Sequence, residues 1–327
     1  MADELQIIDG IPIRSEQIGF SADQLIACGK CAKANPPNRL NCFYCGEALE
    51  VTPEIAAGIR FTPSEIEDWE QGVSVVVTDW LSGGDPQAIA SAISIESELV
   101  ASLVMIEPPL PLFRIRPEEA DEVASRLSRL GLMVECVEDS SLALGKPPIR
   151  LKGIAFGNDS WALHSFNSSD RNVVEISEIV LFVVGSLVTT TVESKLKRKR
   201  KEIEEFDEHL ASSDHAVIDV YTSTDEIGFR ILPHGFDFSC LGKRKSLVAG
   251  ENIRNLLETL HELAPKAAFD RSYSTKSAIL DCVWPRTVAN TSKGIERNWF
   301  GVQRGVGSIT SNEAQFTRYS RTRRKLL

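Results

Sequence analysis

The clearest pattern of hydrophobic and polar residues lies between residues 107 and 149. Residues 112–116 (LFRIR) alternate as a β-strand does, and Pro117 then opens a helix whose apolar residues recur on one face. Gly131 ends this helix, and residues 132–137 (LMVECV) form the next strand. The pattern predicts a β-α-β module over residues 107–149. Its turns carry no glycine-rich phosphate loop, so we expect a packing unit and no nucleotide site.

From residue 150 onward the pattern changes to short apolar runs, which predict a β-rich domain over residues 150–285. A helix is expected near its end, at residues 251–260, because four aliphatic residues there recur on one stripe and Pro265 follows. Together with the β-α-β module, this predicts an α+β protein of several domains. The candidate strands are residues 151–156, 161–166, 173–176, 179–192, 216–222 and 228–233.

A run of antiparallel strands closed by one helix resembles the outline of a pleckstrin-homology-like domain. The likeness covers roughly residues 150–270 and is one of topology alone, because no specific motif accompanies it. It implies a fold and no particular activity.

The longest apolar run, residues 176–192, is followed by a basic stretch at 195–201, as in a membrane helix with positive flanks. The part of this run that contains no charged residue, residues 179–192, is about 14 residues long, whereas a membrane-spanning helix needs about 20. It is also rich in valine and threonine, which favour strands. We therefore expect a buried strand and no membrane span. Residues 195–210, basic and then acidic, are predicted to be a solvated helix or a loop insertion.

Three further segments carry weaker patterns. Residues 1–24 have little periodicity and are predicted to be a leader, and residues 51–106 a helical segment that connects two domains. Within the latter, residues 64–80 are predicted to be a helix that turns into a strand at residues 73–78 (VSVVVT), which have the composition of a strand. Residues 286–327 lose hydrophobic periodicity and are predicted to be a flexible basic tail. Its cations, candidates for binding nucleic acid or another polyanion, are Arg318, Arg321, Arg323, Arg324 and Lys325.

Charge is distributed unevenly along the 327 residues, whose formal net charge is -10. Residues 1–150 carry 11 Lys/Arg against 24 Asp/Glu, whereas residues 151–327 carry 25 against 22. Phosphate binding needs clustered cations, so the first half is not expected to present a broad nucleic-acid surface. The N-terminus has no basic and apolar signal segment, and the cysteines are not arranged as a disulfide framework. We expect a cytoplasmic protein.

Four cysteines near the N-terminus have the spacing of a metal site. Cys28, Cys31, Cys42 and Cys45 form the pattern Cys-x2-Cys-x10-Cys-x2-Cys. Two such pairs supply the four thiolates of a tetrahedral Zn²⁺ site that leaves no position open for water or substrate. We therefore expect one structural Zn²⁺ per chain, bound by these four residues.

The segment CGKCAKANPPNRLNCFYCGEAL, residues 28–49, resembles the small bacterial zinc ribbons. These combine a Cys-x-x-Cys pair, an Asn-Pro-Pro turn and a Cys-x-x-Cys-Gly. The resemblance extends over residues 26–49 and implies a zinc-binding module at 25–50, without implying a function. The spacing also approaches that of the Ran-binding nucleoporin finger. That type has tryptophan where this chain has Ile26, which puts RNA or ubiquitin binding of that kind in doubt. Phe43 and Tyr44 are expected to pack on the module, and the alternative is that they form a small exposed aromatic patch.

The sequence shows no arrangement typical of an active site. There is no His-x-x-x-His spacing, no Gly-x-Ser-x-Gly elbow and no P-loop. Cys240 and His234 could form a nucleophile pair, but Cys240 stands between apolar neighbours and is interpreted as a buried, unreactive thiol. We assign no catalytic residue. The sequence favours a non-enzymatic adaptor or scaffold with a protein partner. The alternatives are a nucleic-acid-associated protein, and an enzyme whose site the sequence does not reveal.

Overall fold

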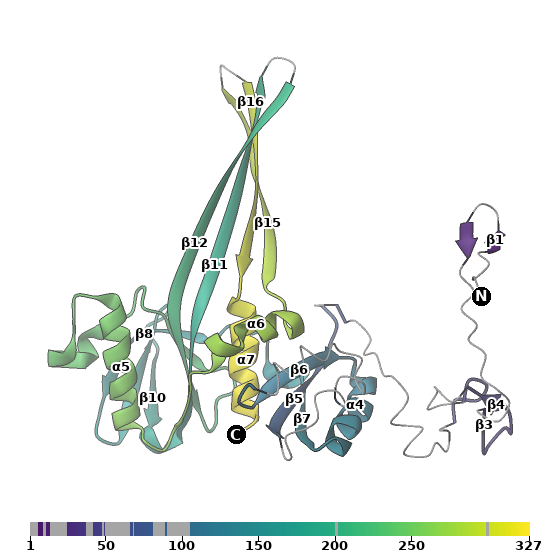
Figure 1. The fold of residues 1–327 in the computed structure, drawn as a ribbon. Helices are drawn as coiled ribbons and strands as arrows, with labels where there is room; N and C mark the ends of the chain where they lie inside the picture. Colours follow the sequence, from purple (N-terminus) through teal and green to yellow (C-terminus); the bar gives the residue numbers. More distant parts are fainter. Residues whose placement is uncertain are drawn as a thin grey trace.

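The structure is a computed structural model that describes residues 6–8, 11–13, 25–36, 42–47, 49, 66–67, 69–80, 89, 105–199, 202–298 and 301–327. Only the backbone is described for residues 6–8, 11–13, 193–199, 202–209, 278, 291–298 and 301–306. Helices and strands are mixed, which confirms the α+β class (Figure 1). Near the N-terminus, β1 (Gln6–Ile8) pairs with β2 (Ile11–Ile13), and β3 (Ile26–Ala27) with β4 (Ala34–Asn35).

The predicted β-α-β module is present and contains one strand more than expected. Strand β6 (Leu110–Ile115), helix α4 (Pro117–Arg129) and strand β7 (Leu132–Glu138) follow the predicted order. Strand β5 (Val73–Trp80) lies between β6 and β7 and is antiparallel to both. Val73, Val75 and Val77 of β5 pack against the apolar face of α4. The strand expected at residues 73–78 is confirmed.

The helical connecting segment predicted for residues 51–106 is thereby corrected in its middle. Residues 73–80 are the central strand of the small sheet and not a linker, because their alternate valines are buried against α4. Residues 51–65, 81–88 and 90–104 lie outside the described residues, so the helices expected there stay predictions.

The larger part of the chain forms one nine-stranded sheet in the order β10-β9-β8-β13-β12-β11-β16-β15, with β14 (Ala268–Asp270) beside β11. All six predicted strands of residues 150–233 are confirmed. This single open sheet is the only sheet formed by the described residues of 149–311, and the pleckstrin-homology-like outline stays a prediction. The other strands are β8 (Ile149–Phe156), β9 (Ser160–Ser165), β10 (Arg171–Glu175), β11 (Ile179–Lys199), β12 (Glu202–Thr222), β13 (Phe229–Ile231), β15 (Thr287–Asn298) and β16 (Gly301–Ser311).

Three helices cover the base of this sheet. Helix α5 (Ala249–Leu263), which is the predicted closing helix, packs on the face that carries Phe182. Helices α6 (Tyr273–Val283) and α7 (Glu313–Lys325) pack on the face that carries Leu181 and Val183. Alternate residues of β11 therefore enter two different cores. This double burial explains why residues 179–187 read as a nearly continuous apolar run. Short 3₁₀ turns η2 (Asp139–Leu142), η3 (Ile176–Glu178) and η4 (Phe238–Arg244) join the elements.

Gly185 allows β11 to approach the two helices closely. A Cβ atom at this position would lie 2.5 Å from the Phe316 ring of α7 and 2.8 Å from the Tyr273 ring of α6. Any side chain here would push the helices away from the sheet, so glycine is a packing requirement at this position.

Beyond the helices, β11 and β12 continue as a long hairpin, and β15 and β16 as a second hairpin beside it (Figure 1). We call this projection, residues 187–199, 202–215, 287–298 and 301–311, the arm. The solvated helix or loop predicted for residues 195–210 is wrong for its described residues, because residues 195–199 belong to β11 and residues 202–210 to β12. Lys199 is in register with Glu202 and Lys195 with Asp207. The basic and acidic blocks are thus placed opposite each other across the hairpin, where unlike charges favour strand pairing.

The flexible basic tail predicted for residues 286–327 is also wrong. Residues 287–311 form β15 and β16, and residues 313–325 form α7. Phe316 and Tyr319 are buried in the core under the sheet. The composition of the segment is misleading because the cations of α7 bind acceptors from distant parts of the chain, and one of them, Arg321, is buried.

Arg321 is the most deeply buried of these cations, with 1% of its surface exposed. Its guanidinium donates to the carbonyl oxygens of Leu142, Ala143, Lys146 and Ile227 at distances between 2.5 and 3.1 Å. Three of these carbonyls lie between the small sheet and the large one, and the fourth precedes β13. One side chain of α7 thus joins both sheets.

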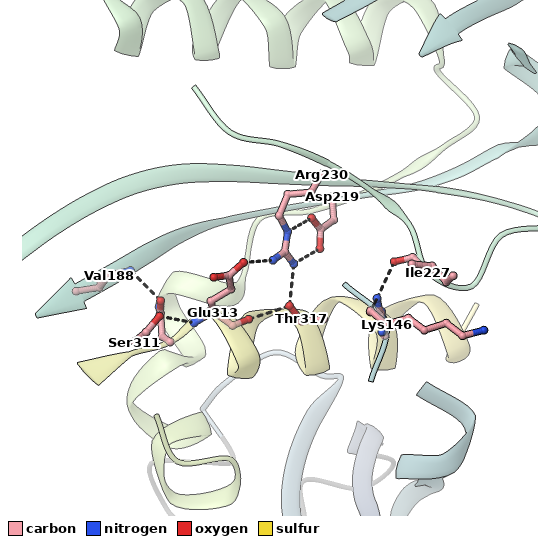
Figure 2. A network of polar contacts seen from close by, with 10 residues as sticks. Lys146, Val188, Asp219, Ile227, Arg230, Ser311, Glu313 and Thr317 are labelled. Atoms are coloured by element: carbon pink, nitrogen blue, oxygen red, sulfur yellow. Dashed lines mark hydrogen bonds and ion pairs between the residues drawn. The ribbon is translucent and has the colours of Figure 1, made fainter. Parts of the chain in front are cut away.

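A second buried arginine reaches α7 from the sheet. Arg230 of β13 binds Asp219 of β12 through two hydrogen bonds of 2.7 and 2.8 Å, and also donates to Thr317 and Glu313 of α7 (Figure 2). Both Arg230 and Asp219 are almost fully buried. Because removal of one partner would leave a buried charge uncompensated, this cluster fixes where α7 docks.

We expect Arg321→Met to lower the free energy of unfolding by about 3 kcal/mol or more, because four buried carbonyls would lose their donor. Arg254→Met, at an exposed position of α5, is the matched control and should change it by less than about 0.5 kcal/mol. Deletion of residues 312–327 should prevent folding of the large sheet. Urea unfolding followed by circular dichroism measures each effect. A deletion variant whose free energy of unfolding is unchanged would contradict the docking of α7.

A second prediction concerns pH. Burial of the Asp270 carboxyl opposes its ionisation, but the hydroxyl and backbone N–H of Ser272 and the Arg323 guanidinium outweigh burial and lower its pKa. The stability gained from this carboxylate is therefore present above about pH 4, the unfolded-state pKa, and lost as pH falls through the lower folded-state pKa. Asp270→Asn should cost about 3 kcal/mol at neutral pH, and this difference should narrow below about pH 4.

Urea unfolding of wild type and Asp270→Asn over a pH series checks this. The matched control is Asp159→Asn, at an exposed position in the turn between β8 and β9. A difference between wild type and Asp270→Asn that stays constant down to about pH 2.5 would contradict the assigned pKa direction.

Candidate metal centre

The four predicted ligands lie on two turns of the same construction. The backbone N–H of Ala32 donates to the carbonyl of Cys28 at 2.8 Å, and that of Gly46 to the carbonyl of Cys42 at 2.9 Å. Cys28 N–H in turn reaches the Lys33 carbonyl at 3.0 Å, and Cys42 N–H the Glu47 carbonyl at 2.7 Å. Each Cys-x-x-Cys pair is thus folded into a tight turn by its own backbone.

Both turns end on a residue in the left-handed conformation. Gly46 has φ of 73° and Ala32, at the equivalent position of the first turn, has φ of 56°. Glycine adopts this conformation without steric cost, whereas alanine pays about 1 kcal/mol. The need for a left-handed residue after each pair explains Gly46, and Ala32 meets the same need with some strain.

The four sulfur atoms converge. Their Sγ atoms all lie within 4.8 Å of one another, with 3.6 Å between Cys28 and Cys45 and 3.5 Å between Cys31 and Cys42. Four sulfurs bound tetrahedrally at about 2.3 Å from one ion would be roughly 3.8 Å apart. The cluster therefore has the size needed to hold a metal ion. In the described part of the chain it is the only such group of histidine, cysteine or carboxylate ligands.

The charge state of the sulfurs also favours a cation. Burial opposes ionisation of the Cys42 thiol, but the backbone N–H groups of Tyr44 and Cys45 and neighbouring thiols outweigh it and lower its pKa to about 6. The pKa of Cys45 is raised to about 12: the Glu47 backbone favours its thiolate, but burial and the other sulfurs oppose it. Four thiolates so close together repel one another, and a dication removes this repulsion.

Asn35 connects the two turns from β4. Its side-chain oxygen accepts the backbone N–H of Phe43 at 2.9 Å, and its amide nitrogen donates to the Lys33 carbonyl at 2.7 Å. The residue is completely buried. Asn35 therefore holds the second turn against the first, which gives a physical reason for the asparagine of the Asn-Pro-Pro turn.

The second turn presents two aromatic rings to solvent. Phe43 is 69% and Tyr44 55% exposed, and their rings meet edge to face at 5.5 Å. The Lys33 ammonium lies 4.3 Å from the centre of the Tyr44 ring. The expectation that these rings pack on the module is wrong. They form a small exposed surface, which we call the aromatic patch (Phe43, Tyr44 and Lys33).

The other sequence candidates do not form a second site. Cys240 is half-buried and its burial raises its pKa to about 11, which agrees with an unreactive thiol. The five basic residues of the predicted tail all have partners within the chain. Arg318 binds Asp139, Arg323 binds Asp270, Lys325 binds Glu226, and Arg321 and Arg324 donate to backbone carbonyls.

An open pocket of about 600 Å³ lies where the small sheet, α7 and the base of the arm meet. Its wall includes Trp284, Pro147 and Lys146, and its one carboxylate is that of Glu313, which already binds Arg230. Among the described residues the lining includes no histidine, cysteine or aspartate. The pocket therefore offers no pair of groups for general acid–base catalysis.

The comparisons with known proteins add no family. No family model matches this chain, and neither a curated protein nor a solved structure does. Among the described residues there is no helix long and apolar enough to cross a membrane.

Sequence reasoning located the cysteines but missed the arm. The signal was present in residues 195–208, where a basic block is followed by an acidic one. If the chain folds back between the two blocks, unlike charges lie opposite each other on neighbouring strands. A basic block followed by an acidic block is therefore as compatible with a β-hairpin as with a helix.

We expect the purified protein to contain one equivalent of metal, and Cys42→Ser to lose it, because the variant removes a buried ligand. The matched control is Cys136→Ser, at an exposed thiol outside the cluster. Elemental analysis of freshly purified protein measures the metal. Metal-free wild type, or full metal content in Cys42→Ser, would contradict the site. Asn35→Ala should keep the ligands and weaken binding, seen as faster loss of metal to a chelator.

Proposed function

We propose that this protein is a non-enzymatic adaptor or scaffold that binds other protein surfaces. The arm is the observation that carries this proposal (Figure 1). It projects far beyond the helices that cover the sheet, and its outer strands are exposed at residues 210–215 and 287–290. The described side chains of its inner strands, at residues 189–192 and 307–311, are only half-buried, so they contribute little to the core. Its length and exposure are those of a contact surface.

In this proposal the metal is Zn²⁺ and its role is structural. Four cysteine ligands leave no position open for water or substrate, which suits a closed zinc ribbon. Zinc binding supplies the folding energy of so small a module. Reduced thiols require a reducing compartment, so we also propose that the protein acts in the cytoplasm.

The zinc module contributes a second contact surface, the aromatic patch. Exposed aromatic side chains beside a cation are typical of binding hot spots, because rigid rings bury much area at a low cost in conformational entropy. The same module also carries an exposed ion pair between Lys30 and Glu47, 2.6 Å long.

The alternative is association with nucleic acid through the C-terminal basic residues, and it has less support. Each of the five cations has an acceptor within the chain, so phosphate would have to displace existing ion pairs and hydrogen bonds. The enzyme alternative has no arrangement of described residues in its favour.

The test is capture of protein partners with the full chain as bait. The double variant Phe43→Ala/Tyr44→Ala is used in parallel. The matched control is Phe166→Ala, which removes an exposed aromatic side chain just after β9 of the large sheet. We expect wild type and control to retain a protein at a fixed stoichiometry after nuclease treatment and high salt, and the double variant to lose it. Binding only of nucleic acid, with a steep salt dependence, would contradict the adaptor proposal.

A further inference from the structure

The arm has two long open edges. Within the described residues, β12 has a strand on its outer side only at Ile218–Val220, where it pairs with β13, so Glu202–Val217 is unpaired on that side. At the opposite edge, β15 pairs only with β16. Neither stretch contains proline. Long unpaired edges expose a row of backbone donors and acceptors to any incoming strand, and folded proteins normally interrupt or cover them.

We propose that the arm adds edge to edge to the arm of another copy of this chain, β12 of one copy against β15 of the next. The inference rests on the scaffold role proposed above and names the partner: a second copy, joined by a shared antiparallel sheet. The contact is head-to-tail, so each copy keeps one free edge and the assembly grows into a ring or a filament.

Strand direction is the first support. β12 and β16 are each antiparallel to β11, and β15 is antiparallel to β16. Along the arm the four strands therefore alternate strictly, and β12 and β15 run in opposite directions. If two copies lie side by side with their arms pointing the same way, β15 of one meets β12 of the next antiparallel. The alternation continues across the junction without interruption.

The residues at the edges are the second support. Each edge strand carries an exposed aliphatic side chain, Leu210 on β12 at 72% and Val288 on β15 at 61%. The register can be followed across the four strands: Val288 of β15 pairs with Thr310 of β16, Thr310 with Thr190 of β11, and Thr190 with Ser212 of β12. Val288 is therefore level with Ser212, which is two residues from Leu210. The inner strands β11 and β16 are half-buried at the same height. Exposed aliphatic residues thus lie at nearly one level on both open edges.

Charge provides the third support. Residues 202–208 of β12 include five acidic residues and no basic one, whereas β15 contains Lys293 and Arg297 with Glu296. In the register of the arm, Asp207 is level with Lys293 through Lys195 and Gly305. Two β12 edges would bring acidic blocks together, whereas β12 and β15 bring unlike charges together. The sequence therefore disfavours the two-fold pairing and favours the head-to-tail one.

The first experiment measures assembly with the metal-loaded full chain in analytical ultracentrifugation across a dilution series. We expect masses above the 36.1 kDa of one chain, rising with concentration. Val288→Lys and Leu210→Lys should return the protein to the monomer, because a charge then replaces the edge aliphatic residue. Thr190→Lys is the matched control, at the same level on the inner strand β11, and should assemble as wild type does. Circular dichroism verifies that each variant is folded.

The second experiment tests the geometry by disulfide formation. Residues directly opposite in an antiparallel pair have Cβ atoms about 5 Å apart, within reach of a disulfide. Ser212→Cys/Val288→Cys should therefore give a ladder of cross-linked copies on mild oxidation, whereas each single variant should not. The register between the two strands can shift only in steps of two residues if each side chain is to stay on its face of the sheet. The double variants Leu210→Cys/Val288→Cys and Asp214→Cys/Val288→Cys therefore test the two neighbouring registers.

Three results would overturn the inference. The first is a protein that stays monomeric at every concentration and gives no cross-linked ladder with any cysteine pair. The second is cross-linking by Ser212→Cys alone, which indicates that two β12 edges pair with each other. The third is loss of assembly in Thr190→Lys, which indicates that copies associate through a face of the arm. The scaffold proposal is tested separately by the aromatic-patch variant. A monomer whose partner capture still depends on Phe43 and Tyr44 would remove this inference and leave the proposed function intact.

Discussion

The large sheet depends on how two arginines, Arg321 of α7 and Arg230 of β13, are buried. Arg321 is enclosed with four backbone carbonyls, and Arg230 with the carboxylate of Asp219 and two residues of α7. Burying a guanidinium is costly unless acceptors surround it, and the acceptors here come from η2, the segment after it, β12 and the turn before β13. The helix can therefore dock in one place only, where all these groups meet.

The docking of α7 connects the two parts of the molecule. Arg318 of α7 and Arg114 of β6 both bind Asp139 at the end of the small sheet, and Trp284 donates to Ser74 of β5 at 3.1 Å. Lys276 of α6, which is almost fully buried, donates to the Pro109 carbonyl at 3.0 Å. Burial lowers the pKa of Lys276. These polar contacts are specific in direction, so they fix the relative position of the two sheets as apolar packing alone would not.

The base and the arm of the sheet differ in what stabilises them. At the base, β11 is buried on both faces between α5 and the pair α6–α7. In the arm the same strand has only its neighbours β12 and β16, and its residues 189–192 (TTTV) are half-exposed. The composition changes accordingly from aliphatic to threonine and serine. The core thus anchors a projection whose own stability comes from backbone pairing and cross-strand side chains.

The sequence by itself determined the elements whose signal is local. The β-α-β module, the six short strands, helix α5 and the two cysteine turns each follow from a period, a cap or a spacing within a few residues. The convergence of Cys28, Cys31, Cys42 and Cys45 was predicted for the same reason, since it follows from their spacing. Tertiary structure alone decided where β5, the arm and α7 belong. The acceptors that bury Arg321 lie about 90 to 180 residues away in the chain, so a segment that is basic in composition becomes a core helix only when distant carbonyls surround it.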